Sequence, residues 1–203
     1  MSQIALPLAP GGPPERILLG ASNQPVIDAL GRAADWPFRT AVLVGPPRSG
    51  KSLIASWFAA SGAGEAVDDA DALPEDELFH RWNRAQASGT ALLLVSGAAP
   101  GAWRVTLPDL ASRLGSAWLL RIGAPDDALL AELLEDYARR RGLSLGVGAV
   151  EWLLARLERS YAAAEELVAA ADRLSLERKQ PVTLALLRDA LAVTGGEWQP
   201  RLL

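Results

Sequence analysis

The chain has 203 residues, seven tryptophans, one histidine, no cysteine and a formal net charge of −4 at pH 7. These counts exclude disulfides, cysteine-ligated metal sites, thiol nucleophiles and metal sites that need two imidazoles. The acidic charge disfavours a broad nucleic-acid-binding surface. Without an apolar run of about 18–20 residues or a basic segment before the first apolar residues, the sequence predicts a soluble, cytoplasmic protein with no membrane span.

Residues 1–14 contain four of the 14 prolines and are expected to form a flexible tail. Apolar residues then alternate between strand-like runs and helix-like spacings as far as about residue 123. The predicted elements, in chain order, are a helix over 23–34, a strand over 40–44, a helix over 51–60, a short strand over 65–69, a helix over 75–87, and strands over 90–95 and 119–122.

From residue 126 onward the pattern is helical throughout, with breaks at Gly142, Ser160 and Pro181. The predicted helices are 126–141, 148–159, 162–177 and 183–192. Alternating strands and helices followed by helices alone indicate an α/β domain with a parallel sheet over 15–124 and a small all-helical domain over 125–195. Residues 196–203 are expected to form a second tail.

One segment matches the phosphate-binding pattern G-x-x-x-x-G-K-[ST] between a predicted strand and a predicted helix. In this pattern the glycines let the backbone curl so that successive N–H groups face a phosphate chain, and the helix N-terminus adds its dipole. Lys51 would reach the β- and γ-phosphates, and the Ser52 hydroxyl would bind Mg²⁺. The predicted site for ADP or ATP with Mg²⁺ comprises Gly45, Pro46, Pro47, Arg48, Ser49, Gly50, Lys51 and Ser52.

A P-loop also needs a carboxylate at the end of a neighbouring strand to hold Mg²⁺. Asp68 and Asp69 follow a short apolar step and are candidates, although a solvated pair of loop carboxylates would have the same sequence. Only 15 residues separate Ser52 from Asp68, where a P-loop domain usually fits another strand and helix. Either the chain has lost that edge unit, or the Mg²⁺ carboxylate lies elsewhere.

The order of these motifs resembles the AAA+ ATPases of the DnaA family, and within it the short Hda-type members found in alphaproteobacteria. The resemblance runs over most of the chain. It is most specific at Leu107–Leu114, which matches L-P-D-L-x-S-R-L, the box VII segment of this group. The other matching segments are G-x-S-N at 20–23, Walker A at 45–52, Walker B at 67–71, L-F-H-x-x-N at 78–83 and the sensor 1 strand at 92–96.

The resemblance implies an AAA+ sheet flanked by helices, with an edge strand lost, followed by a helical lid domain. It assigns Arg113 as an arginine finger that acts on the γ-phosphate held by a neighbouring subunit. It also assigns Asp69 a catalytic role, and Asp68 a metal-binding role with Ser52. The N-terminal segment is similar to the sliding-clamp-binding peptide Q-L-x-L-P-L of the group, which implies clamp contacts by Gln3, Ile4, Leu6, Pro7 and Leu8.

Two positions depart from the family pattern. The place of the sensor 2 arginine falls on Ala162, and the acidic sensor 1 position falls on Gly97. The resemblance therefore implies a protein that binds nucleotide firmly but hydrolyses it poorly alone. The sequence also lacks the family's DNA-binding helix-turn-helix domain, so direct sequence-specific DNA binding is not expected.

The implied function is regulation of replication initiation: the chain would dock on the sliding clamp and stimulate ATP hydrolysis by DnaA. A homo-oligomer is compatible with this function. Two alternatives stay open at the level of the sequence. One is a self-contained P-loop enzyme such as a small-molecule kinase or an ATPase, and the other is a nucleotide-binding module without catalysis.

Overall fold

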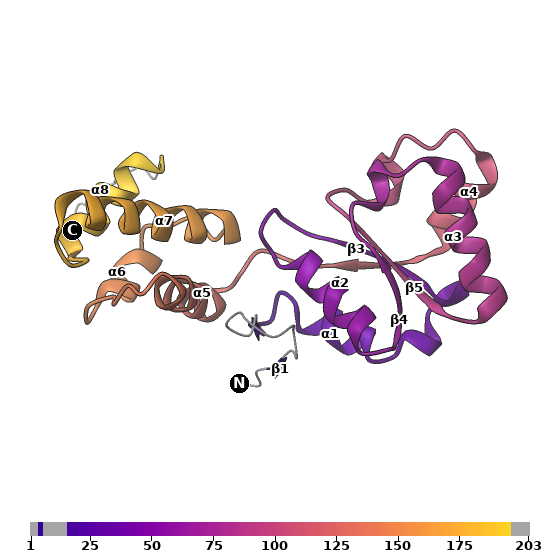
Figure 1. The fold of residues 1–203 in the computed structure, drawn as a ribbon, viewed down its shortest axis with the longest axis horizontal. Coiled ribbons are helices and arrows are strands. Elements are labelled where there is room, and N and C mark those ends of the chain that lie inside the picture. The colour runs from indigo at the N-terminus through magenta and orange to yellow at the C-terminus, as the bar shows by residue number, and fades with distance from the viewer. Residues whose placement is uncertain (1–3, 6–15, 196–203) are drawn as a thin grey trace. The chain divides into compact units, whose positions relative to one another are not determined.

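The computed structural model describes residues 4–5 and 16–195, and its chain divides into two compact units between Gly123 and Ala124 (Figure 1). In the first unit a two-residue strand, β1 (Ile4–Ala5), pairs antiparallel with β2 (Arg16–Ile17). The rest of the predicted N-terminal tail and the whole predicted C-terminal tail, 196–203, lie outside the described residues.

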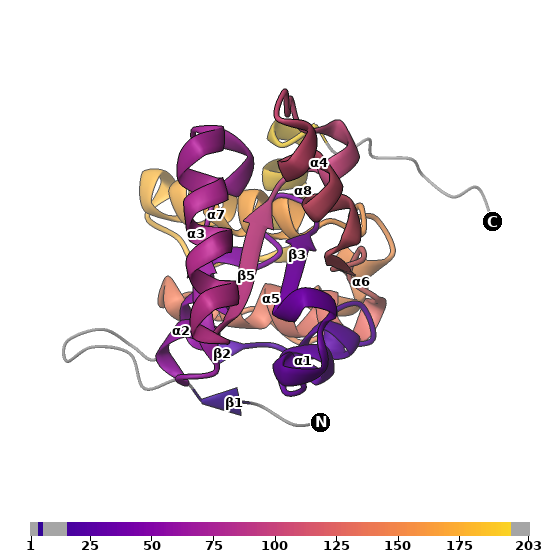
Figure 2. The ribbon, with the colours of Figure 1, turned by 90° about the vertical axis from the view of Figure 1, so that its right-hand side faces the viewer.

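A four-stranded parallel sheet forms the centre of the first unit. Its strands are β3 (Thr40–Val44), β4 (Gly64–Val67), β5 (Ala91–Ser96) and β6 (Trp118–Arg121), in the spatial order β4-β5-β3-β6. Figure 2 shows β3 beside β5 at the middle of the unit. Every residue of β3 and β5 is buried, which explains why both read as continuous apolar runs. Because all four strands are parallel, their carboxyl ends meet at one edge of the sheet.

Helices cover both faces of this sheet. They are α1 (Gln24–Leu30), α2 (Lys51–Ala60), α3 (Glu75–Ser88) and α4 (Pro108–Ser116). The apolar faces of α3 and α4 pack on one side of β3 and β5 through Leu78, Trp82, Leu110 and Leu114. On the other side α2 contacts β4 and β5, and its Phe58 stacks on Trp36 with ring centroids 5.4 Å apart. In Figure 1 the strands pass between α2 and α3.

The structure resolves the unusual spacing between the P-loop and the carboxylate pair. Only residues 61–63 connect α2 to β4, and β4 lies at the edge of the sheet. The chain therefore runs from the P-loop helix directly into the strand that precedes Asp68, without the additional strand and helix that a P-loop domain usually has there. The predicted AAA+-type parallel sheet is confirmed, and its edge unit is absent from this segment.

Three predicted boundaries were wrong by several residues or at the carboxylate pair. The predicted helix over 148–159 ends at Leu154 and is followed by a turn. The predicted strand over 65–69 ends at Val67, because Asp69 adopts a left-handed conformation (φ 47°) that a strand cannot continue. The predicted helix over 23–34 ends at Leu30, followed by Gly31 and then a 3₁₀ turn at Ala33–Asp35. In all three places local turn geometry outweighs the apolar spacing.

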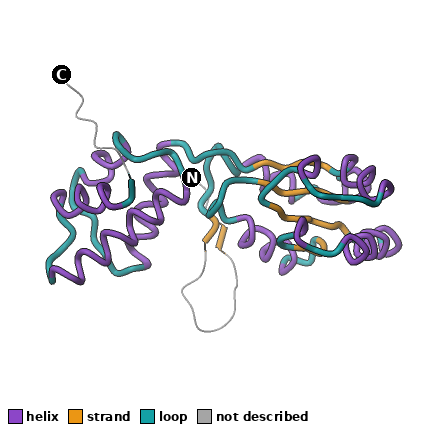
Figure 3. The backbone as a smooth tube through the Cα atoms, turned by 90° about the horizontal axis from the view of Figure 1, so that it is seen from above, coloured by secondary structure: helices purple, strands orange, loops and turns teal. Residues whose placement is uncertain are grey.

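The second unit is built of helices alone within its described part, 124–195, as Figure 3 shows. Its helices are α5 (Asp127–Arg140), α6 (Ala149–Leu154), α7 (Tyr161–Arg178) and α8 (Leu184–Val193). Side-chain oxygens of Asp126, Ser160 and Thr183 cap three of these helices by accepting a backbone N–H three residues on. Leucines and alanines from all four helices form its core. No described helix is long and apolar enough to cross a membrane.

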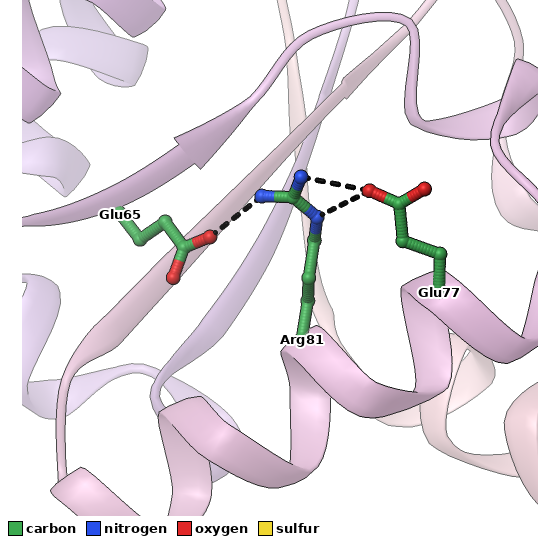
Figure 4. Close-up of polar contacts among 3 residues, drawn as sticks. All are labelled: Glu65, Glu77 and Arg81. Carbon is green, nitrogen blue, oxygen red and sulfur yellow. Dashed lines mark hydrogen bonds and ion pairs between the residues drawn. The ribbon is translucent and has the colours of Figure 1, made fainter.

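An ion-pair network fastens α3 to the edge strand β4 (Figure 4). The Arg81 guanidinium lies between two carboxylates, 2.9 Å from Glu65 Oε1 and 2.8 Å from Glu77 Oε1. Glu65 is on β4, two residues before the strand ends, and Glu77 is one helical turn before Arg81. The network thus ties the strand that precedes Asp68 and Asp69 to the helix packed beside it.

Candidate functional site

The loop between β3 and α2 has the backbone of a phosphate-binding loop. After Val44 the chain turns, with the Ser49 N–H donating to the Pro46 carbonyl at 3.3 Å. Arg48 (φ 62°) and Gly50 (φ 83°) both adopt the left-handed conformation, which is free for glycine but costs an arginine about 1–2 kcal/mol. Lys51 is the first residue of α2, so the helix N-terminus faces the loop. In phosphate-binding loops, a curl of this kind directs backbone N–H groups toward an anion.

Close packing at the start of the loop requires glycine. A Cβ on Gly45 would stand 2.8 Å from the Ile122 Cβ and 3.1 Å from the Ser49 Oγ. The Ser49 hydroxyl is itself buried and finds no hydrogen-bond partner among the described residues. A buried hydroxyl without a partner is costly, and a phosphate oxygen in the loop would satisfy it. The residues present therefore fit a nucleotide phosphate.

The Lys51 side chain folds back over the first residues of the loop. Its ammonium donates to the Gly45 carbonyl at 2.9 Å and to the Pro46 carbonyl at 3.0 Å. Burial holds the pKa of Lys51 below its ordinary value of 10.5, and the charges of Asp68 and Asp69 oppose that shift. The carboxylate pair after β4 is therefore close enough to act electrostatically on the P-loop lysine.

Asp68 and Asp69 lie in the turn after β4, at the same edge of the sheet as the P-loop. Both are exposed, and the Asp69 N–H donates to Asp68 Oδ1 at 3.1 Å. Ser52 is exposed in the first turn of α2. Mg²⁺ usually takes one or two protein oxygens together with substrate phosphates, which suits this sparse donor set. Among the described residues no cluster of three or more acidic or imidazole groups could hold a metal by itself.

A cavity of about 300 Å³ opens beside the first residues of the P-loop. One wall is the loop itself at Gly45, and the opposite wall is formed by Gly97 and Ala99, which follow β5. Gly97 supplies no side chain, and the Ser96 hydroxyl is buried and accepts the Ala98 N–H at 3.0 Å. The wall at the sensor 1 position therefore offers no polar side chain to a ligand.

The end of β6 completes this cavity with a residue that the sequence analysis did not single out. Arg121 is exposed and lines the cavity together with Ile122. The only sequence signal is a cation at the end of the apolar run Leu119–Ile122. That signal has meaning only once the sheet order places β6 directly beside the P-loop strand.

Arg113, the predicted arginine finger, is on α4 and does not line this cavity. Its guanidinium donates to Asn83 Oδ1 at 2.5 Å, pairs with Asp109 at 2.8 Å and stacks over the Phe79 ring, 4.7 Å from the centroid. The side chain keeps 28% of its surface exposed. It is thus held in one orientation by its own chain while part of its surface remains open to solvent.

A carboxylate anchors the start of the helix that carries Arg113. Glu75 accepts the backbone N–H groups of Thr106 at 2.8 Å and Leu107 at 2.9 Å. These hydrogen bonds hold the pKa of Glu75 below its ordinary value. This contact holds the segment before α4 against the start of α3. A second contact, between Arg113 and the Phe79–Asn83 turn of α3, holds α4 itself.

The other predicted site residues belong to separate parts of the chain. Ala162 is half-buried in the first turn of α7, in the second unit. Of the predicted clamp-binding residues, Ile4 contributes its backbone to β1, while Gln3, Leu6, Pro7 and Leu8 lie outside the described residues.

Replacing both Asp68 and Asp69 by Asn should lower the pKa of Lys51 further, because the two charges that raise it are removed. The chain has only two lysines, Lys51 and Lys179, so an NMR-monitored pH titration of the lysine side chains can follow both. Lys179 is the internal control. An unaltered Lys51 pKa would mean that the carboxylates do not act on the P-loop.

Comparison with known proteins agrees with this geometry. The family described as the Hda lid domain matches residues 126–191, most of the helical unit. An uncharacterized protein of Haemophilus influenzae is 31% identical over 115 residues, which cover 56% of this chain and 50% of that protein. The chain thus spans about half the length of this curated relative.

Solved structures resemble the fold over most of the chain. Domain III of the Thermotoga maritima replication initiation protein DnaA superimposes with a TM-score of 0.71 at 14% identity, covering 87% of this chain and 93% of that one. AMPPCP-bound DnaA from Aquifex aeolicus gives a TM-score of 0.61 at 15% identity, covering 80% of this chain and 66% of that one. Together with the P-loop geometry, these likenesses show a P-loop fold of the AAA+ type, and residues 126–191 match the Hda lid domain.

Proposed function

We propose that this chain binds an adenine nucleotide with Mg²⁺ at residues 45–52 and regulates replication initiation by acting on DnaA in trans. The observation that carries the proposal is the pairing of a well-formed P-loop with an Hda-type lid. Nucleotide binding is also supported by the AMPPCP bound to the similar Aquifex aeolicus DnaA and by the ADP bound to the similar AAA domain of FIGL-1.

The residues of the site suit nucleotide binding better than they suit catalysis of nucleotide hydrolysis. Lys51, the loop N–H groups and Ser49 suit the phosphates, and Ser52 with Asp68 would hold Mg²⁺, which supplies charge neutralisation when bound. Asp69 would orient water from the turn after β4. The wall at Gly97 and Ala99 offers no polar side chain to the terminal phosphate, and this favours slow hydrolysis by the chain alone.

Arg113 is the residue we assign to the action in trans. A guanidinium that stabilises charge on a partner's γ-phosphate must be oriented before the partner arrives, because each ordered side chain otherwise costs binding free energy. Asp109, Asn83 and Phe79 provide that orientation. The exposed part of the guanidinium leaves room for a phosphate, and the planar fork suits bidentate contact.

We further propose that Gln3, Ile4, Leu6, Pro7 and Leu8 bind the DNA sliding clamp, which would bring the chain to DnaA at the replication site in the cytoplasm. An extended peptide with two leucines and a proline suits apolar pockets on a partner. Ile4 and Ala5 are already extended as β1. Self-association of the chain is compatible with this arrangement but is not needed for it.

Arg113→Ala should abolish stimulation of ATP hydrolysis by DnaA, returning it to the unstimulated rate, since arginine fingers contribute about 10³-fold or more. The measurement is phosphate release by ATP-loaded DnaA in the presence of the clamp. Arg104→Ala is the matched control, because Arg104 is exposed and has no ion pair among the described residues. Stimulation that survives in the Arg113 variant would refute the assigned mechanism.

Replacing both Leu6 and Leu8 by Ala should eliminate binding to the clamp, because the two apolar anchors are lost. Surface plasmon resonance against immobilised clamp measures this directly. Nucleotide affinity should be unchanged in the same variant. Undiminished clamp binding would move the docking segment elsewhere in the chain.

A further inference from the structure

The cavity beside the P-loop contains one charged side chain. Its lining consists of backbone and apolar groups from the loop, from the segment after β5 and from the end of β6, with Arg121 as the single exception. A nucleoside triphosphate carries several negative charges, so an arginine in this wall is positioned to interact with them. Arg121 belongs to none of the family motifs identified in the sequence.

The sheet register fixes where Arg121 stands. Arg121 is opposite Val44, the last residue of β3, and the Ile122 N–H donates to the Val44 carbonyl at 2.8 Å. Paired residues of parallel strands point to the same face of the sheet. Arg121 therefore lies beside Val44 on the same face of the sheet, at the carboxyl edge where the P-loop leaves the sheet.

The Arg121 guanidinium has no ion pair or hydrogen bond with any residue that the structure describes. Arg81 and Arg113 contrast with it, since carboxylates of the same chain hold both. Arg121 is exposed and lies at the rim of the cavity. Because no described residue pairs with its guanidinium, that group is free to bind an anion.

The position of Lys51 identifies which part of the nucleotide this cavity faces. A P-loop lysine reaches the β- and γ-phosphates. Its ammonium here lies on the carbonyls of Gly45 and Pro46, and these two residues also line the cavity. The cavity is thus at the terminal-phosphate end of the loop, where the opposite wall offers no polar side chain.

We propose that Arg121 binds the terminal phosphate of a nucleoside triphosphate and makes the site prefer the triphosphate over the diphosphate. This proposal rests on the nucleotide binding proposed above. The two N–H groups of a planar guanidinium match two phosphate oxygens, so one arginine can supply the discrimination that Gly97 and Ala99 cannot.

The test uses the full chain with Arg121→Gln, a neutral variant of similar length, and Arg104→Gln as the matched control. Fluorescence titration with labelled AMPPCP and labelled ADP, in Mg²⁺, measures both affinities. In the Arg121 variant the AMPPCP affinity should fall about tenfold, while ADP affinity should change less than about twofold. The control should match the wild type for both nucleotides, and thermal melting should show that all three proteins are folded.

The outcomes separate this inference from the proposed function. If the wild type binds neither nucleotide, the proposed function itself fails. If the wild type binds both and Arg121→Gln leaves AMPPCP binding unchanged, only the role of Arg121 is overturned. An equal loss for AMPPCP and ADP would also overturn it, because Arg121 would then contact the inner phosphates.

Discussion

The burial of β3 between two parallel neighbours is the constraint on which the site depends. All five of its residues are buried, and its backbone is bonded to β5 on one side and β6 on the other. A strand held in this way cannot shift register without unpairing both ladders. It therefore fixes the starting point of the P-loop and brings the carboxyl ends of β4, β5 and β6 to the same edge of the sheet. At that edge Asp68 follows β4, Gly97 follows β5, and Arg121 is the last residue of β6.

Two arginines of the first unit have different surroundings, and these fit the two different phosphate contacts that we propose for them. Arg113 is held by Asp109, Asn83 and Phe79 and is absent from the lining of the chain's own cavity, which suits a group presented to a partner. Arg121 has no partner in the described chain and lines that cavity, which suits a group kept for the chain's own nucleotide. The two side chains differ in how firmly neighbouring residues hold them, because an exposed guanidinium keeps one orientation only when fixed groups contact it.

The P-loop and most helices and strands could be predicted from the sequence, because a motif of fixed spacing and apolar periodicity are local signals. The end of β4 could not be predicted, because the residue that adopts the left-handed conformation there is Asp69 and not a glycine. The contacts of Arg113 and the placement of Arg121 depend on the spatial order of the strands and on the packing of α4 against α3. The spacing of residues along the chain does not indicate either feature, so the sequence did not predict Arg121 as a site residue.

The central claim, that the loop over 45–52 holds an adenine nucleotide, is tested most directly by calorimetric titration of the full chain with ADP and with ATP in the presence of Mg²⁺, alongside Lys51→Ala. A charge-assisted contact to phosphate contributes about 1.5–3 kcal/mol, so the variant should bind at least about tenfold more weakly than the wild type. Binding that is undetectable in the wild type, or equally tight in both proteins, would contradict the account.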